Sequence, residues 1–150
     1  MAELAVETDG AKIKTGSVGS CVVIAIYDPI AGVGGLAHAM LPSAGDDPPG
    51  GGVYESEAKY ADRSVDNLLR RIEAAGGSRK NLKAKLVGGA MMFKILGGDQ
   101  YGIGHQNVSA ARRRLGELGI PIESEDVGGS AGRIVELTVG SGLIEVSTKL

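Results

Sequence analysis

The chain has 150 residues and a mass of 15.3 kDa, a length typical of one domain that buries its own core. Hydrophobic residues make up 43% of it and charged residues 23%, which argues against a disordered or fibrous protein. A formal net charge of −2 and an aromatic content of 3% argue against phosphate-binding and base-stacking surfaces, so no nucleic-acid partner is expected.

The first ten residues, MAELAVETDG, are acidic and lack the basic start and apolar run of a signal peptide. No stretch approaches the roughly 18 consecutive apolar residues of a membrane-spanning helix. We therefore expect a cytoplasmic protein with a single domain over residues 1–150 and no membrane insertion.

A β-hairpin is the first strong structural signal along the chain. Residues 22–27 form an apolar run rich in β-branched side chains, Asp28 and Pro29 supply turn chemistry, and a second apolar run covers 33–41. We expect the two runs to pair antiparallel. A surface loop or lid is expected over 43–52, where Asp, Pro and Gly are concentrated.

Two helices are predicted from apolar spacing and termination signals. Over residues 55–75 apolar side chains recur at helical spacing, and Gly76 stands where a helix commonly ends. Asn107 is the expected N-cap of a helix over 108–118, which Gly119 would close.

The remaining elements are mostly strands. Residues 83–87 resemble another strand, residues 90–96 a short helix, and the runs 133–139 and 143–147 flank a glycine-rich turn typical of a hairpin. Because strands joined by short turns must pair antiparallel, the sequence predicts an α+β fold with mixed, partly antiparallel sheets.

The most reactive side chain lies in a loop of small residues. The stretch from Thr15 to Cys21, TGSVGSC, brings a thiol to the start of an apolar strand, and small residues such as Gly19 and Ser20 let a substrate carbonyl approach backbone N–H groups. Taken alone, a free cysteine is more often a small buried hydrophobe than a nucleophile. A single cysteine also excludes an internal disulfide and a site of paired cysteines for a metal, so no metal cofactor is expected.

His38 offers this thiol a base. The hairpin places Cys21 and His38 near the same end of two paired strands, where an imidazole can accept the thiol proton. A histidine hydrogen-bonded to a loop carbonyl explains the same residue without catalysis. Thr15 is a candidate to orient the imidazole, and a plain loop hydroxyl is the alternative.

Several ordered motifs extend this interpretation over nearly the whole chain. They are Gly19-Ser20-Cys21, GGLAHAMLP over 34–42, KYAD over 59–62, Gly88-Gly89-Ala90 with Met92-Phe93, Ile103-Gly104 with Asn107, and EDVGG over 125–129 followed by Gly132-Arg133. Together these motifs resemble the chemoreceptor glutamine deamidase family, CheD. One departure is that Gly16 and Ser17 stand where the loop of that family commonly has Leu and Gly.

The resemblance implies hydrolysis of selected glutamine side chains of methyl-accepting chemoreceptors to glutamate, with release of ammonia. It implies a triad of Cys21 as nucleophile, His38 as general base and acid, and Thr15 as the residue that orients the histidine, with Gly19 and Ser20 in the loop that receives the oxyanion. It further implies a sandwich of β-sheets with flanking helices, no organic cofactor, and the chemotaxis phosphatase CheC as an inhibitory partner.

Three alternatives remain open at this point. The chain could be a non-catalytic binding module for the phosphatase or a receptor, or the same thiolate could hydrolyse a glutamyl methyl ester. A thiol redox sensor is weaker, because the chain has no second cysteine to resolve an oxidised thiol.

Overall fold

A computed structural model of the chain describes residues 3–8, 10–43, 57–91, 102–139 and 141–149. The strands are β1 (Glu3–Thr8), β2 (Lys12–Lys14), β3 (Val22–Asp28), β4 (Val33–Ala39), β5 (Lys83–Gly88), β6 (Ile122–Val127), β7 (Gly132–Thr138) and β8 (Leu143–Lys149). The helices are α1 (Ala61–Ala74), α2 (Ile103–Glu117) and the short 3-10 helix η1 (Arg79–Asn81).

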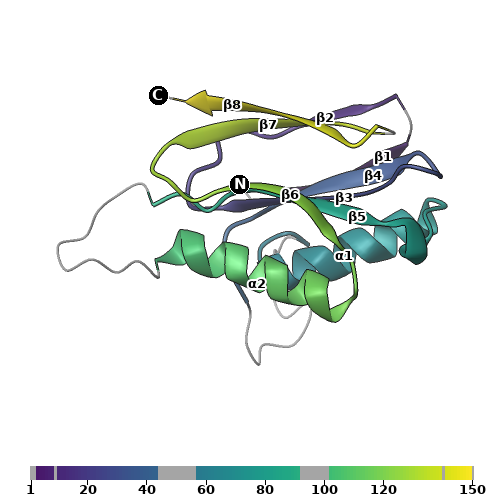
Figure 1. Cartoon of the computed structure of the whole chain (residues 1–150), viewed down its shortest axis with the longest axis horizontal. Coiled ribbons are helices and arrows are strands. Elements are labelled where there is room, and N and C mark those ends of the chain that lie inside the picture. Colours follow the sequence, from purple (N-terminus) through teal and green to yellow (C-terminus); the bar gives the residue numbers. More distant parts are fainter. Residues whose placement is uncertain (1–2, 9, 44–56, 92–101, 140, 150) are drawn as a thin grey trace.

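These elements form three layers. A five-stranded sheet of order β1-β4-β3-β5-β6 lies between a three-stranded sheet of order β2-β7-β8 and the two helices α1 and α2 (Figure 1). The neighbouring strands pair antiparallel except β5 and β6, which are parallel. The expected α+β fold, with mixed sheets packed as a sandwich and flanking helices, is confirmed.

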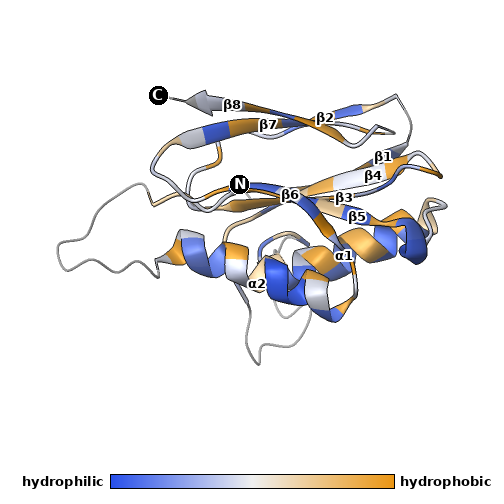
Figure 2. Cartoon of the chain, viewed as in Figure 1, coloured by the Kyte–Doolittle hydropathy of each residue, from blue (hydrophilic) through white to orange (hydrophobic). Residues whose placement is uncertain are grey.

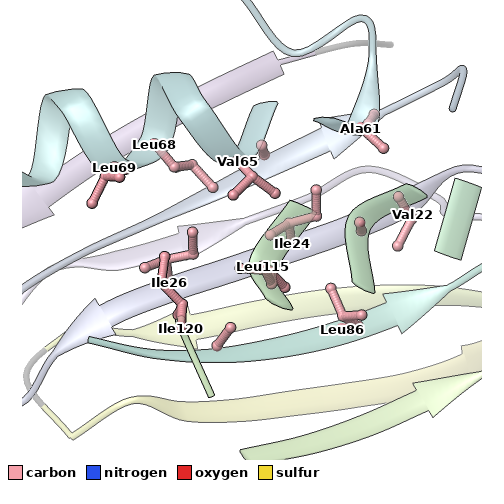
Figure 3. Packing of buried hydrophobic residues seen from close by; sticks show 14 of the residues in the cluster. Val22, Ile24, Ile26, Ala61, Val65, Leu68, Leu69, Leu86, Leu115 and Ile120 are labelled. Atoms are coloured by element: carbon pink, nitrogen blue, oxygen red, sulfur yellow. The ribbon is translucent and has the colours of Figure 1, made fainter. Parts of the chain in front are cut away.

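The central strand β3 is buried on both faces, which explains its continuous apolar run. Val22, Ile24 and Ile26 face the helices, where they pack against α1 and α2 (Figure 3). Val23 and Ala25 face the three-stranded sheet and belong to a second core cluster. Both helices turn hydrophobic residues to the sheet and hydrophilic residues outward (Figure 2).

The predicted hairpin is present. β3 and β4 pair antiparallel, with Val22 opposite Ala39 and Val23 opposite His38. β4 ends at Ala39 instead of reaching Leu41, because the backbone amides of Met40 and Leu41 donate to the carbonyl of Lys59 at 3.1 and 3.0 Å and leave the sheet. The end of the hairpin opposite its turn is thus joined to the segment that enters α1.

The start of the second helix differs from the prediction. α2 begins at Ile103, with Gly102 in the N-cap position, so the prediction that Asn107 caps the helix was wrong. Asn107 lies inside the helix and is fully buried, because it faces the sheet. The closing glycines were predicted correctly, since Gly76 and Gly119 follow the two helices with φ of +106° and +72°.

Other element boundaries differ less from the prediction. In the described residues α1 begins at Ala61, and the expected loop over 43–52 and short helix over 90–96 lie mostly outside the described residues. β1, β2 and β6 were not predicted. Within the described part of the chain, no helix combines the length and apolar character needed to cross a membrane.

Asp28 stabilises the turn of the hairpin from a fully buried position. Its carboxylate accepts hydrogen bonds from the amides of Ile30 and Ala31 at 2.8 and 2.9 Å and from the amide of Ser78 at 2.8 Å. Burial alone would raise the pKa of this carboxyl, but the three backbone donors and the side chain of Asn81 together outweigh burial and lower its pKa. The charged form therefore stabilises the fold.

Replacing Asp28 by asparagine is expected to lower the free energy of unfolding at pH 7 by about 2 kcal/mol, because an amide cannot accept on both of its polar atoms. A carboxyl with a lowered folded-state pKa contributes stability above its unfolded pKa and loses that contribution as the pH falls through its folded pKa. In urea unfolding, the difference in free energy of unfolding between wild type and Asp28→Asn should therefore become smaller as the pH falls. A difference that does not depend on pH would contradict the role of the Asp28 carboxylate.

Candidate active site

The predicted nucleophile and base lie at the end of the hairpin opposite its turn. Cys21 immediately precedes β3, and His38 is the residue before the last in β4. The pairing of β3 and β4 ends at Val22 opposite Ala39, so Cys21 lies one residue beyond the last paired rung, while Val23 is opposite His38. Cross-strand partners share a face, and Cys21 packs against the same core cluster as Val23, so Cys21 and His38 lie on a shared face at this end of the hairpin.

The shared face points toward the three-stranded sheet. Val23 belongs to the core cluster between the two sheets, and the side chain of Cys21 packs against the same cluster. Leu36, two residues before His38, is also part of this cluster. The thiol and the imidazole therefore lie at one edge of the space between the sheets.

Burial sets the protonation of the pair. His38 is 6% exposed, and its Nε2 atom has no hydrogen-bond partner in the part of the chain that the structure describes. Burial lowers the pKa of the His38 imidazole, so the ring is neutral and able to accept a proton near pH 7. Burial also raises the pKa of the Cys21 thiol. A nucleophilic thiolate here thus requires a base that removes the thiol proton during the reaction.

Thr15 approaches from the other sheet. Its amide donates to the carbonyl of Val135 at 2.8 Å, and its Oγ1 accepts from the amide of Val135 at 3.1 Å. Because Val135 faces the space between the sheets, its cross-strand partner Thr15 faces the same space. The hydroxyl proton remains available for a further acceptor, although no hydrogen bond joins Thr15 and His38 among the described contacts.

The loop that carries the nucleophile is fixed through its carbonyl groups. The carbonyl oxygens of Gly19, Ser20 and Cys21 accept from the Ala90 amide at 3.0 Å, from Asn107 Nδ2 at 2.9 Å and from the Gly89 amide at 2.7 Å. Among the described residues, no acceptor is bonded to the amides of Gly19 and Ser20. These N–H groups are therefore free to stabilise an oxyanion beside the thiol.

Two polar residues at this end had no predicted role in the site. Asn107 reaches the loop from α2, and Arg133, which is 8% exposed, exchanges backbone hydrogen bonds with Val18 at 2.7 and 2.8 Å. The Arg133 guanidinium also donates to the carbonyls of Gly128 at 2.9 Å and Gly88 at 3.4 Å. The only sequence signal for Arg133 was its place in the Gly132-Arg133 motif of the family resemblance. In the described ranges, His, Cys, Asp and Glu form no group of three that could hold a metal ion.

Comparison with known proteins assigns the chain to a family. A family model described as CheD chemotactic sensory transduction matches residues 40–148. The chain belongs to the CheD family. The resemblance suggested by the motifs is therefore confirmed. The family match begins just after His38, whereas individual relatives are similar over almost the whole length.

Relatives of this chain include a protein of Halalkalibacterium halodurans named chemoreceptor glutamine deamidase CheD. It is 44% identical over 149 residues, which cover 99% of this chain and 90% of that protein. A protein of Archaeoglobus fulgidus named probable chemoreceptor glutamine deamidase CheD is 45% identical over 133 residues, covering 89% and 81% of the two chains.

Proposed function

We propose that this CheD protein hydrolyses selected glutamine side chains of methyl-accepting chemoreceptors to glutamate, with Cys21 as the nucleophile. The names of its relatives support the reaction and the substrate class. The observation that carries the proposal is that Cys21 packs against the core cluster that His38's cross-strand partner Val23 belongs to, and that His38 is buried with its Nε2 unpartnered among the described residues.

The first half of the reaction forms a thioester. His38 takes the proton from Cys21, and the sulfur attacks the carbonyl carbon of the glutamine amide. Free N–H groups of Gly19 and Ser20 stabilise the negative charge that develops on the oxygen. The protonated imidazole then gives its proton to the amide nitrogen, and the carbon–nitrogen bond breaks to release ammonia.

The second half restores the enzyme. His38 removes a proton from water, the hydroxide attacks the thioester carbon, and the carbon–sulfur bond breaks to leave a carboxylic acid, which loses its proton to solvent and remains as the glutamate carboxylate on the receptor. The thiol of Cys21 regains its proton from the imidazole. Thr15, fixed by Val135 on the opposite sheet, orients the imidazole throughout. These steps need water and no metal or organic cofactor.

Two further expectations follow from the family resemblance. The reaction takes place on the cytoplasmic part of the receptor, so we propose a cytoplasmic protein. A chemotaxis phosphatase of the CheC type binds the deamidase and inhibits it. Neither expectation assigns a catalytic role to a further residue.

The proposal is tested by mass spectrometry of a chemoreceptor cytoplasmic fragment incubated with the protein in the absence of any phosphatase. A gain of about one dalton per converted glutamine, with release of ammonia, is expected for this thiol-dependent reaction. A fragment carrying glutamyl methyl esters, assayed in parallel, shows whether esters are hydrolysed as well. If correctly folded wild-type protein converts no glutamine in several receptor fragments, the chain is a binding module and the proposal fails.

A further inference from the structure

The side chain of Asn107 joins two segments that meet at the candidate active site. Its Nδ2 atom donates to the carbonyl of Ser20 at 2.9 Å and to the carbonyl of Met40 at 3.0 Å. Ser20 immediately precedes Cys21, and Met40 lies two residues after His38. One amide group therefore closes the end of the hairpin that holds both the thiol and the imidazole.

This amide stands where the backbone ladder stops. Paired residues of β3 and β4 end at Val22 and Ala39, so beyond this rung the two segments are joined by the Asn107 side chain. The amide orientation is fixed, because only Nδ2 can donate to two carbonyls. Asn107 Oδ1 is buried and has no partner among the described residues. Burying an unpaired acceptor destabilises the fold. The favourable contribution of Asn107 to the structure therefore comes from its two donated hydrogen bonds.

Close packing of helix α2 on the residues that follow β5 fixes the position of the Asn107 amide relative to the hairpin. Gly104, one turn before Asn107, packs directly on the backbone of Gly89 and Ala90, and a β-carbon at Gly104 would come within 2.7 Å of their carbonyl oxygens. The amides of Gly89 and Ala90 in turn donate to the loop that carries Cys21. The helix, the end of β5 and the nucleophile loop therefore form one closely packed unit.

We propose that Asn107 is a positioning residue that sets the separation of Cys21 and His38. This inference rests on the proposed function, because the kcat that tests it is that of the deamidase reaction. Without the two donated bonds, the end of the hairpin can open and the thiol can move away from the imidazole. A displacement of about 1 Å at such a pair costs about 10²-fold in rate, and the loss falls on kcat because Asn107 is buried beneath the site and does not face a receptor.

The test compares Asn107→Asp with Asp28→Asn. Aspartate keeps the shape of asparagine but cannot donate, and its charge opposes the two carbonyls. Asp28→Asn also loses buried hydrogen bonds, but at the opposite end of the same hairpin. We expect kcat for receptor deamidation to fall about 10²-fold in Asn107→Asp with KM unchanged, and both constants to be unchanged in Asp28→Asn.

Alkylation of Cys21 by iodoacetamide gives a second readout that needs no receptor. Loss of base assistance should lower the alkylation rate of Asn107→Asp at neutral pH by about tenfold or more and move the pH profile toward that of an isolated thiol. If wild-type protein deamidates no receptor, the proposed function fails, while alkylation still reports on the position of the thiol.

A third variant covers the case in which Asn107→Asp does not fold. Asn107→Leu removes the donors and the unpaired acceptor, keeps the branching at Cγ and carries no charge, so it is expected to fold and to show the same losses in kcat and alkylation. Folded Asn107 variants with wild-type kcat and a wild-type alkylation profile would overturn the inference.

Discussion

Replacing His38 by glutamine is expected to lower the rate of receptor deamidation by about 10²–10⁴-fold, and replacing Cys21 by alanine is expected to abolish it. The thiol has a raised pKa, and His38, at the same end of the hairpin, is a buried imidazole whose Nε2 has no hydrogen-bond partner among the described residues. Without that base, only the small fraction of thiolate present at neutral pH can attack the amide. Mass spectrometry of the receptor fragment measures both variants against wild type.

The pH profile separates a role of His38 as the base from general damage to the fold. Because burial lowers the pKa of His38, wild-type kcat/KM should lose activity in acid only below the usual titration range of histidine, and His38→Gln should lack this acid limb. Near-normal activity in His38→Gln would mean that another group is the base.

Replacing Gly88 by alanine is expected to lower the free energy of unfolding by roughly 2–5 kcal/mol, the sum of a left-handed backbone and an overpacked site. Gly88 ends β5 with φ of +114°. A β-carbon there would overlap the carbonyl oxygen of Cys21 and come within 2.8 Å of Val18 Cγ1. The clash falls on backbone that carries the nucleophile, so activity should fall together with stability.

Gly119→Ala is the matched control for this variant. Gly119 also has a positive φ, +72°, but a β-carbon there would meet no atom within 4 Å. Backbone strain alone should therefore lower the free energy of unfolding of Gly119→Ala by about 1–2 kcal/mol, and the variant should keep its deamidase activity. Urea unfolding and iodoacetamide alkylation of Cys21 compare the two directly. Equal losses of unfolding free energy in both variants would show that the contact between Gly88 and the nucleophile loop does not contribute to stability.

The parts of the fold that could be predicted are those with local signals. The hairpin of β3 and β4 was predictable because two apolar runs flank a turn of Asp28 and Pro29, and its register places His38 opposite Val23, two residues from Cys21. The closing glycines of both helices were equally local. In each case a few consecutive residues determine the geometry.

The parts that were missed depend on distant contacts. β6, with the sequence IESEDV, lies at an edge of the sheet with most of its residues exposed, so it has no apolar periodicity. Asn107 matches the preferences of an N-cap, but its partners Ser20 and Met40 are 87 and 67 residues away in sequence. Nothing near Asn107 indicates that its amide is directed into the core, so local propensity assigned the wrong role.

The contact between Thr15 and Val135 has a consequence for the order in which this protein matures. The hairpin of β3 and β4 precedes β7 in the chain and can form from neighbouring residues, whereas Thr15 gains its partner Val135 only after β7 has been synthesised. Contacts between residues far apart in sequence also form more slowly than local ones. During synthesis Cys21 and His38 are therefore brought to the end of the hairpin before Thr15 is fixed, and Thr15 takes its place only when β7 pairs with it.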